Sequence, residues 1–126
     1  MARTFLLLGA LNALVSVAAG AFGAHGLRQS VSAELLQVFE VGARYQMYHA
    51  LGLMVVAWAV TARVPAAALA GWAMLVGIVL FSGSLYALVL TGVRGLGAIT
   101  PFGGVSFLVG WAALAVGAFR WVIQSS

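Results

Sequence analysis

Two histidines are the residues of this chain whose side chains are best suited to chemistry. His25 lies near the end of the apolar run AGAFGAHGL, and His49 lies in the run RYQMYHALG. An imidazole can transfer a proton near neutral pH or bind a metal ion. The chain contains no cysteine, and its only acids are Glu34 and Glu40. Thiol catalysis and thiolate metal sites are therefore excluded, and no catalytic set or metal-ligand repeat accompanies the histidines.

In a first interpretation, polar side chains around the histidines line a pocket. Ionisable residues inside a membrane mark functional sites, such as ligand or proton pathways. Helical spacing places Tyr45, Gln46 and Gly52 on a common side with His49. The candidate polar pocket comprises Asn12, His25, Tyr45, Gln46, His49 and Tyr86.

A second interpretation of the same residues is structural. His25 caps the carbonyls that end the first helix, while His49 and Asn12 hydrogen-bond other helices. A third is a bis-histidine haem or metal site, which needs both rings in one gap. Neither a CxxCH motif nor a third ligand supports it. We expect the structural role, with no metal and no cofactor, and keep the other two as alternatives.

Composition places these side chains in a membrane protein. Hydrophobic residues make up 64% of the 126 residues and charged residues 6%, whereas soluble domains carry about 25% charged residues. The six basic residues are arginines scattered along the chain, so they form no basic patch for nucleic acid. The length predicts a single domain, residues 1–126, whose first partner is the lipid bilayer.

Four stretches are long enough to cross a bilayer, which takes about 20 apolar residues. They cover about residues 4–24, 45–62, 66–90 and 102–122. Pro65 suits the first turn of the third helix. Thr100 and Pro101 suit the N-cap and the first helical position of the fourth. The predicted fold class is an all-α integral membrane protein, a bundle of four transmembrane helices.

The segment SVSAELLQVFEVGAR, residues 30–44, is too polar to span a membrane and too apolar for a free loop. Its apolar side chains share one face at helical spacing, and its charged side chains lie largely on the other. Glu40 and Arg44 are spaced as an i, i+4 ion pair. We predict an interfacial amphipathic helix that begins at one of the serines near its start. It continues, or bends at Gly42, into the second span.

Small side chains recur every three or four residues along three of the spans, which places them on one face of each helix. In lipid, such faces promote helix packing because they let backbones approach closely. They comprise Gly9, Asn12, Ala13, Ser16, Gly20 and Gly23 in the first span, Ala66, Ala70, Ala73, Gly77 and Ser84 in the third, and Gly103, Ser106, Gly110, Ala113 and Gly117 in the fourth. They predict a compact bundle; one face could instead form the seam of a homo-oligomer.

The loop LTGVRGLGAITPFGG, residues 90–104, is rich in glycine. It follows no strand and lacks the Gly-Lys-Ser/Thr ending, so it is not a P-loop. A helix N-terminus with an arginine nearby still attracts an anion. The candidate contacts for a lipid phosphate are Arg94, Thr100, Gly103 and Gly104.

Four ordered motifs cover most of the chain: GAFGAHGL, RYQMYHALGL, FSGSLYALVLTG and GAITPFGGVSFLVGW. Through them the chain resembles the YgdD/YwdK-like family of small inner-membrane proteins, also called domain of unknown function 423. The resemblance implies four transmembrane helices in a bacterial inner membrane and implies no activity. The family's motif residues fall on His25, Tyr45, His49, Ser82, Gly83, Tyr86, Thr100, Pro101, Gly103, Gly104 and Trp111.

We therefore expect a non-enzymatic protein of the inner membrane that packs against itself or against a larger membrane complex. The alternative is a small carrier, channel component or lipid-binding protein that uses the polar pocket. Four spans place both termini on one side, with Arg3, Arg63 and Arg120 there and Arg28, Arg44 and Arg94 on the other. The N-terminal amine favours cytoplasmic termini.

Overall fold

The computed structural model describes residues 1–125, and every regular element within them is helical. The first rod consists of α1 (Ala2–Phe22) and the π-helical turn η1 (Gly23–Leu27), and the second is α2 (Ala33–Thr61). The third joins α3 (Ala67–Gly77), the π-helical turn η2 (Ile78–Ser82) and α4 (Gly83–Thr91). A short 3-10 turn, η3 (Arg94–Ala98), leads into α5 (Thr100–Ser125).

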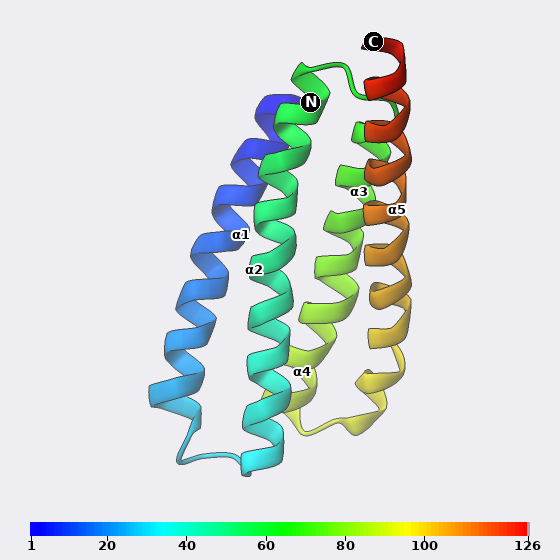
Figure 1. The fold of residues 1–126 in the computed structure, drawn as a ribbon. Helices are drawn as coiled ribbons and strands as arrows, with labels where there is room; N and C mark the ends of the chain where they lie inside the picture. The colour runs from blue at the N-terminus through cyan, green and yellow to red at the C-terminus, as the bar shows by residue number, and fades with distance from the viewer. Residues whose placement is uncertain (126) are drawn as a thin grey trace.

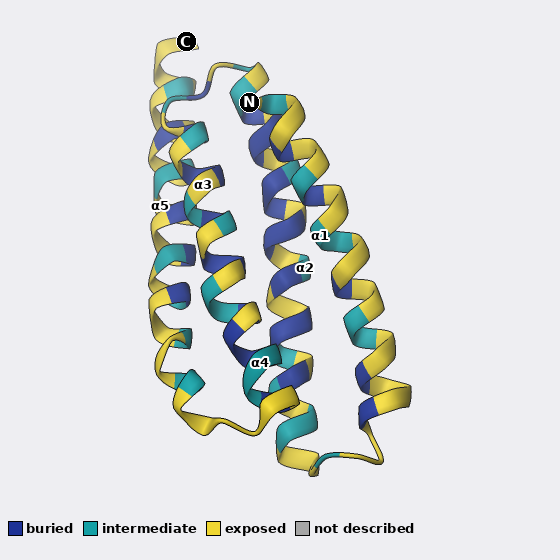
Figure 2. Cartoon of the chain, turned by 180° about the vertical axis from the view of Figure 1, so that it is seen from behind, coloured by how far each residue is buried: buried dark blue, intermediate teal, exposed yellow. Residues whose placement is uncertain are grey.

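The four rods lie side by side and alternate in direction (Figure 1). Both termini and the link between α2 and α3 lie at one end, and η3 and the link between α1 and α2 lie at the other. α1 packs mainly on α2, α2 also packs on α3 and α4, and α5 packs on α3 and η2. Buried residues follow α2 along its length, whereas α1 is exposed over most of its surface (Figure 2).

Three helical stretches are apolar and long enough to cross a membrane: Ala2–Leu27, Ala67–Thr91 and Arg94–Ser125. α2 is not among them, although it lies between two of these rods. Its charged residues all lie in its first part, and the uncharged stretch 45–61 covers about 25 Å at 1.5 Å per residue. The structure thus supports the all-helical fold and three membrane-capable helices.

Residues 33–44 form the beginning of α2, and the helix continues through Gly42 without a break. The Ser32 side chain accepts a hydrogen bond from the Leu35 amide (3.2 Å), as expected of a serine N-cap. Phe39 is buried with Leu27 and Val89. This segment is therefore attached to the bundle through its apolar face.

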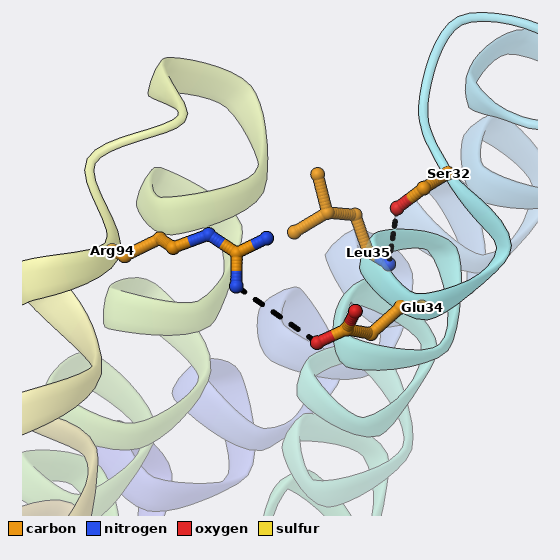
Figure 3. Close-up of polar contacts among 4 residues, drawn as sticks. All are labelled: Ser32, Glu34, Leu35 and Arg94. Carbon is orange, nitrogen blue, oxygen red and sulfur yellow. Dashed lines mark hydrogen bonds and ion pairs between the residues drawn. The ribbon is translucent and has the colours of Figure 1, made fainter.

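The predicted ion pair between Glu40 and Arg44 is not formed. The one ion pair among residues 1–125 joins Arg94 Nη1 to Glu34 Oε1 at 3.9 Å (Figure 3). Both side chains are 74% exposed, so this pair contributes little to stability. Arg94 thus reaches across from η3 to the first turn of α2.

Two predicted helix starts were wrong in detail. α3 begins at Ala67, so Pro65 precedes its first turn, and Ala66 occupies the N-cap position with a left-handed φ of 59°. The link is pressed against α5, where a Cβ on Gly117 would collide with the Pro65 carbonyl oxygen. The Thr100 hydroxyl lies 2.6 Å from that of Ser84. It therefore joins α5 to α4 instead of capping its own helix.

Several glycines of the predicted small-residue faces do pack against neighbouring helices, although Gly20 of the first span faces open space. A Cβ on Gly9 would lie 2.8 Å from the Ala50 carbonyl oxygen of α2, and one on Gly110 would lie 2.9 Å from Met74 Cγ of α3. The ring of Phe107 occupies the space beside Gly77. Around these contacts lies the main core, formed by Phe5, Leu53, Val56, Ala57, Ala70, Met74, Ile78 and Phe107.

Candidate functional site

His49 is buried, at 4% exposure, about four turns into α2. Trp111 of α5 donates its indole N–H to His49 Nε2 (3.0 Å), and His49 Nδ1 lies 2.6 Å from the Tyr45 carbonyl oxygen. Because an indole nitrogen only donates, Nε2 must be the acceptor and the proton belongs on Nδ1. The imidazole is therefore neutral, and both its nitrogens are already bonded within the chain.

The ring of His49 is also held by stacking. Its centroid lies 3.4 Å from that of Phe107, and the two planes differ by 6°. Tyr45 stacks on the same phenylalanine, with a centroid separation of 6.4 Å. A ligand bound through Nε2 of His49 would have to displace the Trp111 hydrogen bond.

A groove of about 530 Å³ runs between α2 and α5 in front of this cluster. Its volume falls within the range of roughly 300–1,000 Å³ typical of small-molecule sites. Among residues 1–125, however, no buried side-chain nitrogen or oxygen is without a hydrogen-bond partner. The groove thus offers apolar and aromatic walls: Tyr45, Tyr48, His49, Leu51, Phe81, Gly104, Phe107, Leu108 and Trp111.

A second polar cluster lies on another side of α2. Tyr86 of α4 donates its hydroxyl to Gln46 Oε1 (2.7 Å), and Gln46 Nε2 donates to Asn12 Oδ1 of α1 (3.0 Å). Asn12 Nδ2 in turn donates to the Leu8 carbonyl (2.9 Å). One row of hydrogen bonds thus connects α4, α2 and α1, and each side chain in it is engaged.

The prediction that Gln46 shares a side with His49 and Tyr45 was wrong. On a helix Tyr45 lies about 40° to one side of His49, and Gln46 lies about 60° to the other. This separation sends Gln46 toward α1 and α4, while Tyr45 and His49 face α5. The predicted placement was right for Gly52, where a Cβ would lie 3.3 Å from the Trp111 ring.

His25 belongs to neither cluster. It is exposed in η1, and its side chain makes no hydrogen bond among the described residues, so the expected cap is not formed. A Cβ on Gly23 would lie 3.1 Å from the Phe39 ring. His49 lies ten residues further along α2 than Phe39, about 15 Å at 1.5 Å per residue. The two histidines therefore do not share a gap.

The residues considered for a lipid phosphate are also separated. Arg94 pairs with Glu34, and Thr100 contacts Ser84. Gly103 packs directly against the Phe81 backbone, whereas Gly104 lines the groove between α2 and α5. Phosphate binding by this set remains a prediction.

Three partners that hold these clusters together were not singled out as site residues from the sequence. They are Trp111, Phe107 and Ser82, whose hydroxyl donates to the Gly42 carbonyl (2.7 Å). A tryptophan in the middle of a span does give a signal, because its N–H needs an acceptor. No group of three or more His, Cys, Asp or Glu residues that could hold a metal ion occurs within residues 1–125.

Comparisons with known proteins agree with this picture of a small helical membrane protein. Residues 19–104 match the family described as "Protein of unknown function (DUF423)". The UPF0382 membrane protein YwdK of Bacillus subtilis is 49% identical over 122 residues, which cover 95% of this chain and 99% of that protein. A UPF0382 membrane protein of Staphylococcus saprophyticus is 50% identical over 118 residues, covering 94% and 98%.

No solved structure matches the chain. The names of these relatives describe membrane proteins and state no enzymatic activity. The family match covers more than half of the chain, and the matches to the relatives cover nearly all of it. The chain therefore belongs to the DUF423 family, a family of membrane proteins of unknown function.

Proposed function

We propose that this protein is a non-enzymatic, four-span protein of the inner membrane that associates with itself or with a larger membrane complex. The observation that carries the proposal is the saturation of its polar groups: every buried side-chain nitrogen and oxygen among residues 1–125 has a hydrogen-bond partner. The polar side chains of the two clusters, His49, Gln46, Asn12 and Tyr86, bond within the chain, and three of these bonds connect different helices. In lipid, interhelical hydrogen bonds of this kind stabilise helix packing.

The fourth span in this proposal is α2. It is packed on one side against α1 and on the other against α3 and α4, both of which belong to membrane-capable rods. A helix so enclosed follows its neighbours across the bilayer. Its first turns, with Glu34 and Gln37 exposed, then lie near the headgroups, as proposed for the amphipathic segment 30–44.

The arrangement of arginines supports cytoplasmic termini. Arg3, Arg63 and Arg120 lie toward the end that holds both termini. At the other end, Arg28 and Arg94 lie in the links, whereas Arg44 lies about three turns inside α2. The links and helix ends near the termini thus carry more positive charge, which favours the cytoplasmic side.

Association with other subunits is supported by the exposed outer face of α1. Only Phe5, Gly9 and Ser16 are buried among Ala2–Phe22. Most of the other side chains of this helix are exposed, on a face that either lipid or another helix covers. An exposed helix face of this kind provides a surface on which a helix of another subunit can pack.

Native mass spectrometry of the protein extracted with its own membrane lipids tests the proposal. We expect a whole-number multiple of the chain mass or a stoichiometric complex with another membrane protein. A monomer with no partner, at all protein-to-lipid ratios, would overturn it. So would catalytic turnover of a lipid that is lost in a His49→Ala variant that still folds.

A further inference from the structure

Two opposite charges on the outer side of α2 have no partner within the described chain. Glu40 and Arg44 are exposed and lie one turn apart. The single ion pair among residues 1–125 joins Arg94 and Glu34, and no hydrogen bond is made by the Glu40 or Arg44 side chain. Since these two spatially close charges remain apart, each is available to another molecule.

Arg44 lies at the depth of the neighbouring apolar spans. The Ser16 hydroxyl of α1 donates to the Ala43 carbonyl of α2 (2.7 Å), which sets the register of the two helices. From there α1 remains apolar through residues 17–22, about 9 Å further along, and Phe22 is 49% exposed. An ionisable residue at such a depth is costly without a partner and marks a functional site by default.

The surface beside these charges is shallow and has a floor of small residues. A groove of about 460 Å³ between α1 and α2 is lined by Ser16, Gly20, Glu40, Ala43, Arg44 and Met47. A Cβ on Gly20 would meet nothing within 4 Å. Another helix can therefore approach closely here, as small residues permit in membranes.

We propose that a second copy of this chain docks on the α1–α2 groove, with Glu40 of each copy paired with Arg44 of the other. This proposal rests on the proposed function and names its partner and surface. A two-fold axis brings the same patch of both subunits together, so one acid and one base per copy give two equivalent ion pairs. The axial offset between Glu40 and Arg44, four residues or about 6 Å, is bridged by their long side chains.

A second copy fits this surface better than an anionic lipid does. A phosphate would pair with Arg44 but would lie beside Glu40, whose negative charge repels it. The second copy neutralises both charges at once. In a low-dielectric surrounding such pairing is stronger than at a water-exposed surface.

Cysteine cross-linking in membranes tests the proposal directly, because the chain has no cysteine of its own. We expect Met47→Cys, in the groove, to form disulfide dimers on oxidation. Val109→Cys, at a 47% exposed position on α5, is the matched control and should remain monomeric. Equal cross-linking at both positions, or none at Met47, would overturn the proposal.

Charge reversal tests the pairing itself. In the Met47→Cys background, Glu40→Arg or Arg44→Glu should each reduce the dimer fraction about tenfold, equivalent to about 1.4 kcal/mol. Combining the two reversals should restore dimers, whereas Glu34→Arg should leave them unchanged. Failure of the double reversal to restore dimers, with wild-type helicity by circular dichroism, would contradict the pairing.

A bulky substitution on the docking surface tests the proposal without disturbing the fold of the monomer. Gly20→Leu adds a side chain where the chain itself leaves open space, so it should fold normally yet block the dimer. Normal dimers in this variant would contradict the surface. If native mass spectrometry shows a complex that none of these changes affects, this inference fails while the proposed function stands. Loss of bound phosphatidylglycerol on Arg44→Glu, without any dimer, would instead assign the site to lipid.

Discussion

The two outermost helices, α5 and α1, are attached to the bundle in different ways. α5 is held by close fits at glycines: Gly103 lies against the Phe81 backbone, and Gly117 lies against the Pro65 carbonyl. α1 has one comparably close fit along its middle, at Gly9. α1 also lies close along α2, and hydrogen bonds join the two helices, from Ser16 to the α2 backbone and between Asn12 and Gln46.

Both modes of attachment suit a membrane, where burial of apolar surface does little to drive helices together. A glycine fit depends on backbone contact over a large area and tolerates no added atom. A hydrogen bond between membrane helices is worth only about 0.6 kcal/mol on average. The difference predicts that α5 is sensitive to any atom added at its glycines, whereas α1 depends more on individual hydrogen bonds, each of which contributes less.

The largest expected effect comes from Gly103→Ala. Its new Cβ would collide with the Phe81 backbone, which cannot move aside as a flexible side chain could. Overpacking of this kind should lower the free energy of unfolding by about 3 kcal/mol. The measurement is unfolding by sodium dodecyl sulfate in mixed micelles, followed by circular dichroism.

The adjacent glycine provides the control. A Cβ on Gly104 would meet nothing within 4 Å, so Gly104→Ala should stabilise the helix by up to about 1 kcal/mol. Opposite signs for neighbouring glycines would establish that fit, and not helix propensity, holds α5. Equal changes in the free energy of unfolding for Gly103→Ala and Gly104→Ala would contradict the idea that close fits at glycines hold α5.

An intermediate effect is expected from Gln46→Leu, which acts on the α1 side. It leaves the Tyr86 hydroxyl without its acceptor and Asn12 Oδ1 without its donor. The free energy of unfolding should fall by about 1–2 kcal/mol. The exposed Gln37→Leu should change it by less than about 0.5 kcal/mol in the same titration. If Gln46→Leu lowered the free energy of unfolding as much as Gly103→Ala does, hydrogen bonds would hold α1 as firmly as close glycine contacts hold α5.

Helix positions and the small-residue faces were predictable from the sequence because both follow from local periodicity. The glycines Gly103, Gly110 and Gly117 of the fourth span do pack against the third rod or the link before it, and Ser32 does cap α2. The continuity of α2 through residues 33–44 was only one of two predicted outcomes. The polar face of residues 33–44 indicates that this side of the helix is exposed to water. It does not indicate whether the opposite, apolar face packs on lipid or on the bundle.

The polar clusters were less predictable than the helices. Asn12, Gln46 and Tyr86 were recognised as candidates and do meet, but the same set also included His25 and His49, which lie elsewhere. Helical spacing gives the direction of each side chain and not the neighbour it meets. A difference of about 100° between Tyr45 and Gln46 is enough to send them to different helices.

The smallest effect is expected from Trp111→Phe, which removes the hydrogen bond that joins α5 to His49 of α2 while keeping an aromatic ring. These two helices share little close backbone contact. The substitution therefore tests how much the hydrogen bond to α2 stabilises the position of α5. If glycine contacts with the third rod hold α5, the free energy of unfolding should fall by only about 0.6 kcal/mol.

Trp72→Phe, at 43% exposure against 42% for Trp111, is the control for loss of an indole. Nitrogen NMR should show the Nδ1–H tautomer of His49 in the wild type and a mixture of tautomers in Trp111→Phe, since Nε2 loses its donor. If Trp111→Phe lowered the free energy of unfolding more than Gln46→Leu does, the difference between the two helices would be reversed, because α5 would then depend on a polar contact more than α1 does.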